Sequence, residues 1–198
     1  MFESICRFID AQQPVWGTVV EELSAGKKLT HWSWFIFPQI RGLGESAMSK
    51  RYAIESVQEA VAYWQHPVLG LRLKECIELM LKHEGRFTPI EVLGSIDALK
   101  LRSCLTLFEW AIPAEPLFNE ALESLYQGER DVHSLLIFKH STQMLREQMI
   151  EKRVAKLKKY KRTKGNEPPR TMVEPRGAMI PLDLVRESDS ANSCDTSL

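Results

Sequence analysis

Residues 26–46 read G-K-K-L-T-H-W-S-W-F-I-F-P-Q-I-R-G-L-G-E-S, and the rest of the chain is organised around them. The stretch places His31, Trp32 and Trp34 between a pair of lysines and a turn with two glycines. Its residues 32–37 could form a strand, but so short a segment cannot build a sheet alone. The stretch combines more aromatic surface with more polar groups than other parts of the sequence, so it is the first place to look for function.

The sequence before this stretch has the spacing of an α-helix. Apolar residues recur at helical intervals over residues 2–24, where Pro14 interrupts and restarts the pattern. Gly26 is a suitable C-terminal stop for this helical region. After the stretch, a short helix is expected to begin at Ser46 or Ser49.

Longer helices are predicted over residues 56–160. Ser56 and Thr88 each begin a sequence with the form of a capping box, and Pro89 suits a first helical position. The clearest amphipathic stripe consists of Leu69, Leu73, Cys76, Ile77 and Met80. Asp131 can cap the last helix. We therefore predict an all-α fold, a single compact domain of about seven to nine short helices without an internal repeat.

The composition is that of a soluble globular protein. Of the 198 residues, 44% are hydrophobic and 26% are charged. No apolar run approaches the ~18 residues needed for a membrane span, and the N-terminus lacks the pattern of a signal peptide. We therefore expect a cytoplasmic protein, or a nuclear one in a nucleated cell, without membrane contact.

The sequence offers no established motif for metal or cofactor chemistry. The four cysteines are scattered without a C-x-x-C pair, which argues against a zinc site and against a disulfide framework. Cys76 and Cys104 lie within apolar helical patterns, which favours small buried residues over redox or catalytic ones. No H-E-x-x-H motif, nucleophile elbow or P-loop is present. We assign neither a metal nor a cofactor.

The formal net charge of zero conceals an uneven distribution of charge. Residues 152–164 contain eight Lys or Arg and no acidic residue, whereas residues 165–198 contain three basic and six acidic residues. Residues 1–151 contain 15 basic and 20 acidic residues. With the Pro-, Gly- and Ser-rich composition after residue 164, this distribution predicts a core domain at 1–150, a basic helical extension at 151–164 and a disordered tail beyond it.

The basic segment, residues 152–164, supports two interpretations. It could be the solvated, frayed end of the last helix. It could also bind phosphates of nucleic acid, or an acidic protein, through its charge. Tyr160 alone interleaves these charges, which limits base stacking.

Seven motifs of the core share their order and spacing with a known family. They are R-F-I-D-A-Q (7–12), H-W-S-W-F-I-F-P-Q-I-R-G-L-G-E-S (31–46), Y-A-I (52–54), E-A-V-A-Y (59–63), H-P-V-L-G-L-R-L (66–73), D-A-L-K-L-R-S (97–103) and T-L-F (106–108). Over about residues 4–138 the chain resembles domain-of-unknown-function family 1810. The resemblance implies a compact, mostly α-helical domain and supplies no reaction, because the family has no established activity. Ser33, Leu93 and Cys104 depart from the residues usual in the family.

Four side chains of residues 26–46 suggest ligand chemistry. His31 could act as a general acid or base, or it could be a buried residue satisfied by backbone groups. Trp32 and Trp34 could stack on a planar ring, or they could be core residues. The Gln39 amide could contact a ligand edge or cap a turn.

The following turn suggests an anion site. The backbone N–H groups of Gly42 and Gly44 could approach a phosphate, with Ser46 opening a helix. A G-x-G pattern alone is a weak signal, because no strand precedes it. Lys28 could supply countercharge, although exposed lysines after a helix end are common.

A second cluster lies on a predicted helix. Asp97, Lys100, Ser103 and Thr106 follow one another at intervals of three, so only neighbouring pairs share a face. Asp97 and Lys100 could form an exposed ion pair, worth under ~1 kcal/mol. If the pair is buried, its cost would instead suggest a site.

These candidates lead to two hypotheses. In the first, the protein binds or acts on a small anionic or nucleotide-like ligand between residues 28–46 and the helix at 97–106, with His31 and Lys100 as candidate catalytic residues. In the second, it is a non-enzymatic interaction module whose basic segment contacts an acidic partner or nucleic acid. The first hypothesis requires His31, a tryptophan face and Lys28 or Lys100 to meet where solvent reaches them.

Overall fold

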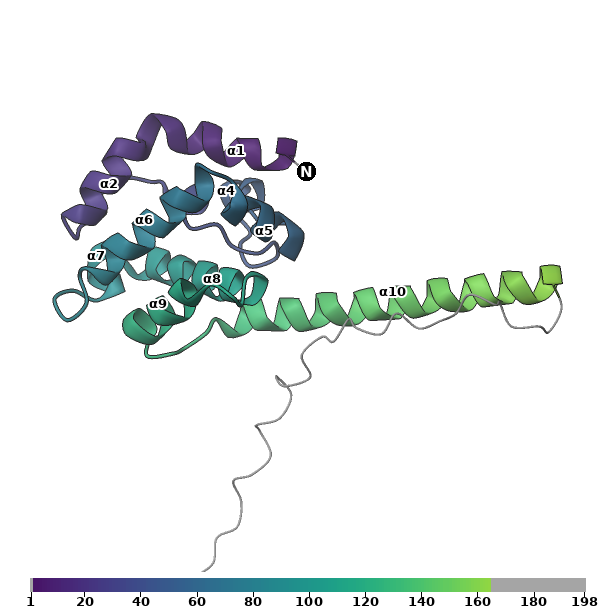
Figure 1. The fold of residues 1–198 in the computed structure, drawn as a ribbon. Coiled ribbons are helices and arrows are strands. Elements are labelled where there is room, and N and C mark those ends of the chain that lie inside the picture. Colours follow the sequence, from purple (N-terminus) through teal and green to yellow (C-terminus); the bar gives the residue numbers. More distant parts are fainter. Residues whose placement is uncertain (1, 165–198) are drawn as a thin grey trace, which may run out of the picture. The chain divides into compact units, whose positions relative to one another are not determined.

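The computed structural model describes residues 2–164, and the elements of this part of the chain are helical (Figure 1). They are α1 (Phe2–Gln12), the 3-10 helix η1 (Gln13–Val15), α2 (Trp16–Ser24), α3 (Ser33–Ile36), α4 (Ala47–Arg51), α5 (Val57–Gln65), α6 (Leu69–Leu81), α7 (Pro89–Leu93), α8 (Ser95–Ala111), α9 (Pro116–Tyr126) and α10 (Val132–Lys164). The predicted all-α fold is confirmed. The predicted disordered tail, residues 165–198, lies outside the described residues.

Two local features divide the helices more finely than their sequence spacing suggests. Pro14 has no backbone N–H, and the N-terminal helical region is split there into α1, η1 and α2. Residues 33–36 lie in the segment that could have been a strand, but they form the single turn α3. Within residues 2–164, the strand-like pairing is one isolated parallel bridge between Ile40 and Ile54.

Three predicted helix starts are confirmed by their caps. Ser56 Oγ accepts a hydrogen bond from the Glu59 N–H at the start of α5. Thr88 and Glu91 form a complete capping box at α7, with proline at the first helical position. Asp131 Oδ2 accepts from the N–H of Ser134 at 2.8 Å and so caps α10.

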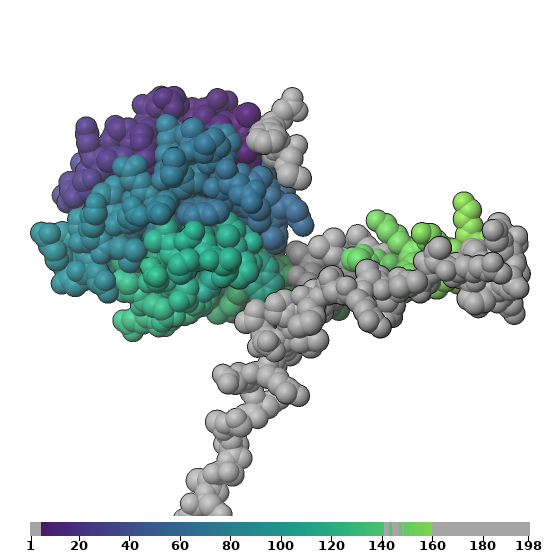
Figure 2. Space-filling model, in the orientation of Figure 1, coloured from purple at the N-terminus to yellow at the C-terminus, as the bar shows by residue number. Residues whose placement is uncertain are grey.

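The helices of residues 2–148 pack in three layers. Figure 1 shows α1 and α2 on one side, α5 and α6 in the middle, and α8 and α9 on the other side; Figure 2 shows the same order as bands from purple to teal. A row of aromatic rings crosses these layers. The ring centroid of Tyr63 lies 5.1 Å from that of Phe8 and 5.5 Å from that of Phe108. Phe108 in turn stacks on Phe118, with 5.4 Å between their centroids. Aromatic contacts therefore connect α1 to α9 through the core.

Helix α8 packs against four other helices, α3, α5, α7 and α9, and buries one of its faces among them. Cys104 of α8 and Cys76 of α6 are both fully buried, as predicted. Burial raises the pKa of each thiol, which opposes formation of the reactive thiolate. Both side chains therefore serve as small core residues.

The chain divides into two units, residues 1–148 and 149–198, with α10 continuing across the division. The described part of the second unit is the helical segment 149–164. The boundaries proposed from composition, after residues 150 and 164, stay predictions. Across residues 2–164, no helix has both the length and the apolar character needed to cross a membrane.

Candidate functional site

The loop that carries Lys28 begins at a glycine stop, as the sequence predicts. Gly26 has a φ of 69°, which a residue with a side chain rarely adopts. Its N–H donates to the Leu23 carbonyl at 3.1 Å, and the Lys27 N–H donates to the Glu22 carbonyl at 3.0 Å. This pair of bonds is the Schellman motif, so α2 ends at a defined position and the chain turns toward α8.

The carboxylate of Glu22 fixes the same loop. Its oxygens accept hydrogen bonds from the N–H of Leu29 at 2.9 Å, from the N–H of Thr30 at 3.0 Å and from Trp32 Nε1 at 2.8 Å. Burial alone raises the pKa of Glu22, but these hydrogen bonds outweigh it and hold the pKa below its usual range. The sequence spacing does not point to Glu22 as a site residue. Its hydrogen bonds fix the backbone of the two residues that lie between Lys28 and His31.

Lys28, Asp97 and Lys100 form one ion-paired cluster. Lys28 Nζ lies 2.7 Å from Asp97 Oδ2, and Lys100 Nζ lies 2.7 Å from Asp97 Oδ1. The three side chains are largely buried, with exposed fractions of 7%, 16% and 14% in chain order. Burial acts to raise the pKa of Asp97, but the hydrogen bonds from the two lysines prevail and lower it. Of the two possibilities for Asp97 and Lys100, an exposed ion pair or a buried one, the structure therefore has the buried one.

Ser33 adds a buried hydroxyl beside this carboxylate, and its residue is 1% exposed. The hydroxyl interacts with the Asp97 carboxyl and helps to lower the pKa of that group. Ser33 therefore favours the charged form of Asp97.

Two tryptophans lie beside the lysines, in different environments. Lys100 Nζ is 4.3 Å from the ring centroid of Trp34, which is half-buried. The exposed ring of His31 lies 6.4 Å from the same ring. Trp32 is 1% exposed, and Lys28 Nζ lies 5.1 Å from its centroid. The exposed edge of the cluster therefore contains Trp34 and His31.

The burial of Trp32 favours the second of its two alternatives, a core residue. Its indole packs against Phe37 and donates to Glu22, so neither the ring nor its N–H is available. Ser103 and Thr106 are also buried, and their hydroxyls donate to the carbonyls one helical turn earlier, of Leu99 and Arg102. Thr106 Oγ1 in addition accepts the N–H of Asp131, so these hydroxyls have structural roles.

The glycine turn makes contacts of a different kind. The Gln39 carbonyl accepts from the Ile54 N–H, in the short parallel bridge. Ser46 caps α4, a helix of five residues. Gly42 has a φ of 103°, and at Gly44 an added Cβ would lie 2.5 Å from the Ser49 side chain. The phosphate role expected for Gly42, Gly44 and Ser46 stays a prediction.

The cluster that remains is suited to binding an anion. Two ammonium groups share one carboxylate, which leaves one surplus positive charge among largely buried groups. Trp34 presents an aromatic ring beside this charge. Within the described residues, no group of three or more His, Cys, Asp or Glu side chains is placed to hold a metal ion.

The fold and this cluster define an all-α domain with a lysine–aspartate–lysine site at its surface. The chain belongs to the family of proteins of unknown function DUF1810, which matches residues 3–138. It is similar to the conserved hypothetical protein Rv1873 from Mycobacterium tuberculosis, known from a crystal structure, with 47% sequence identity and a TM-score of 0.65. That likeness covers 67% of this chain and 94% of the other. No curated protein matches the chain.

Proposed function

We propose that the protein binds a small anionic ligand of the nucleotide type at the cluster of Lys28, Asp97 and Lys100. The observation that carries this proposal is the charge of the cluster. Each of its two lysines is paired with the same carboxylate at 2.7 Å, so one carboxylate balances two ammonium groups. An anion arriving at the surface would offset the surplus charge.

The burial of these side chains strengthens the argument. Removing a charged group from water costs several kcal/mol per ion, even after the surroundings relax. A stable core alone has no need for a second lysine on one carboxylate, because apolar residues of similar volume fill space as well. The cost of burying this second lysine is explained if a ligand completes the site.

The exposed edge of the cluster suggests the rest of the ligand. The half-buried indole of Trp34 offers a surface on which a planar ring can stack. His31 is exposed beside it, and an imidazole can donate a hydrogen bond to a ring edge or accept one from it. Lys100 already donates to Asp97, so we assign it to binding, with His31 the remaining candidate for acid–base chemistry.

Calorimetric titration with inorganic phosphate, AMP and adenosine tests the proposal. At low ionic strength, where charge interactions are least screened, AMP should bind at least about tenfold more tightly than adenosine, a difference of ~1.4 kcal/mol. Lys100→Gln should weaken AMP and phosphate binding together, whereas Trp34→Leu should weaken AMP binding more than phosphate binding. Lys27→Gln removes an exposed neighbouring lysine and is the matched control.

The same titrations can refute the proposal. If AMP and phosphate fail to bind at millimolar concentration to the folded protein, the cluster is a structural ion-pair network. If both bind equally well to Lys100→Gln and to Lys27→Gln, the anion occupies a different part of the surface.

A further inference from the structure

The described part of the second unit is a helix with an exposed apolar stripe. Ile150, Val154 and Leu157 follow one another at i, i+4 and i+7, which places them on one side of α10. Their exposed fractions are 62%, 43% and 36%. Aliphatic side chains in such a row gain free energy when a partner removes them from water.

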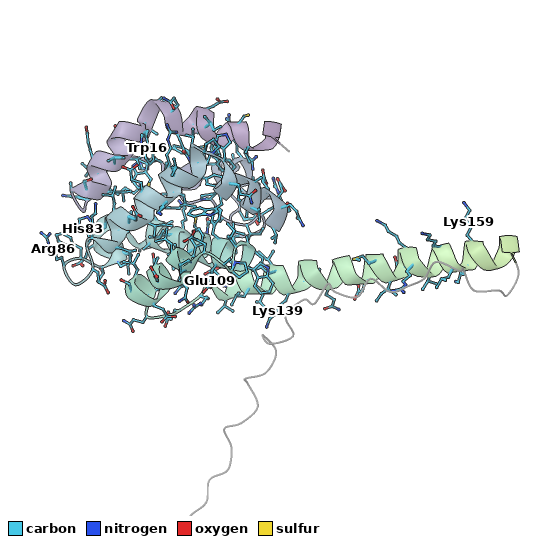
Figure 3. All side chains as sticks on the ribbon, in the orientation of Figure 1. Trp16, His83, Arg86, Glu109, Lys139 and Lys159 are labelled. Carbon is cyan, nitrogen blue, oxygen red and sulfur yellow. The ribbon has the colours of Figure 1, made fainter. Side chains whose placement is uncertain are left out.

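Basic side chains occupy the other sides of the same segment. Lys152, Lys156 and Lys159 also recur at i, i+4 and i+7, and at 100° per residue their row lies nearly opposite the apolar stripe. Arg153 and Lys158 flank the stripe, one on each side, and all five side chains are exposed. Figure 3 shows the Lys159 side chain extending from the helix. The segment is therefore amphipathic, and its polar face is basic.

We propose that this face of α10, residues 149–159, docks an acidic amphipathic helix of a partner protein. Such a helix covers the stripe with its own apolar side chains while its carboxylates meet the flanking Arg153 and Lys158. Residues 152–164 contain eight basic residues and no acid, so a partner helix rich in Glu or Asp is complementary along the whole segment.

Two other occupants fit the surface less well. A second copy of residues 149–159 would bring five basic residues and one acidic residue, Glu151, against the same set, so the two copies would repel each other. Nucleic acid would satisfy the charges, but it would leave the stripe of Ile150, Val154 and Leu157 in water. The apolar stripe is therefore the feature that separates a protein partner from a polyanion.

Fluorescence anisotropy of the full chain with two labelled probes tests this proposal. One probe is a synthetic three-heptad helix of glutamates with leucines at i, i+3, i+4 and i+7, and the other is a single-stranded oligonucleotide. The triple variant Ile150→Ser, Val154→Ser and Leu157→Ser should weaken peptide binding at least tenfold and leave oligonucleotide binding unchanged. Leu71→Ser, at an exposed leucine of α6, is the matched control and should change neither.

A second variant and two further measurements complete the test. Arg153→Gln and Lys158→Gln together, which remove the two charges that flank the stripe, should weaken the binding of both probes. Peptide binding that is unaffected by the serine variant would overturn the proposal, because charge alone would then account for it. Sedimentation showing a dimer that the serine variant abolishes would instead assign the face to a second copy. A tenfold gain in peptide affinity on removing residues 165–198 would assign it to the chain's own acidic tail.

Discussion

Lys28 Nζ lies 2.7 Å from Asp97 Oδ2, and this ion pair joins the loop after α2 to the first turn of α8. Lys100 Nζ takes the other oxygen of the same carboxylate. A single residue thus sets the positions of both ammonium groups. Stability and the proposed anion binding should depend on Asp97 in opposite ways, so its replacement separates the two.

Asp97→Asn should lower stability and raise anion affinity. The amide keeps the shape of the side chain but removes the charge that holds two largely buried ammonium groups together, so the free energy of unfolding should fall by about 2–4 kcal/mol. The same change adds a positive charge to the site, so inorganic phosphate should bind more tightly. Urea unfolding measures the first effect and phosphate titration the second. Asp10→Asn, at an exposed aspartate of α1, is the control. A decrease in both quantities would contradict an anion site at this cluster.

Glu22→Gln should destabilise the loop that carries Lys28. The Glu22 side chain accepts from two backbone N–H groups and from Trp32 Nε1, each of which can only donate. A carboxylate accepts from all of them, whereas the amide NH2 of glutamine would face a donor. We expect a loss of about 1–3 kcal/mol, the cost of an unsatisfied buried donor. Urea unfolding of Glu22→Gln measures this loss, and Glu21→Gln, at an exposed neighbouring glutamate, is the control. Equal losses in the two variants would argue against a role of Glu22 in holding the loop.

The helices could be predicted from the sequence because their signals are local. The caps at Ser56, Thr88 and Asp131 depend on residues three positions apart, and the structure has all three. Glu22 was missed, although a signal existed: it lies three residues after the buried Val19 and next to Leu23, on an apolar face. A charged residue on such a face indicates a buried partner.

The candidate site was only partly predictable, because its decisive contacts join distant segments. No local pattern places Lys28 against Asp97, and periodicity does not say whether Trp32 or Trp34 faces the core. Sequence spacing also does not reveal that the hydroxyls of Ser103 and Thr106 bond to carbonyls four residues earlier, a common arrangement within a helix. At the glycine turn, the φ of 103° at Gly42 and the close approach of Ser49 to Gly44 explain the small residues.

Stability should depend on acid pH through Glu22 and Asp97. The pKa of each is lowered by folding. Such a group stabilises the fold fully above its pKa in the unfolded chain, which is about 4 for a carboxylic acid. As the pH falls, the unfolded chain binds the proton first. The stabilisation is therefore lost as the pH falls toward and through the lower pKa of the folded state. The urea midpoint should therefore be nearly constant above about pH 5 and fall below it. In Glu22→Gln the urea midpoint should fall less steeply below about pH 5. An equally steep fall in the variant would show that Glu22 does not contribute to the pH dependence.

Two glycines in helices should respond to alanine in opposite directions. Gly70 is the second residue of α6, and a Cβ there would lie 1.9 Å from the backbone carbonyl oxygen of Trp64. Neither atom belongs to a flexible side chain, so α5 and α6 must separate, and Gly70→Ala should cost about 3 kcal/mol or more.

Gly17 in α2 is exposed and has nothing within 4 Å of such an atom. Gly17→Ala should therefore stabilise the protein by about 0.5–1 kcal/mol, because alanine loses less backbone entropy in a helix. Thermal unfolding of both variants measures the contrast, and a Gly70→Ala protein as stable as the parent would mean that the turn between α5 and α6 can open at little cost.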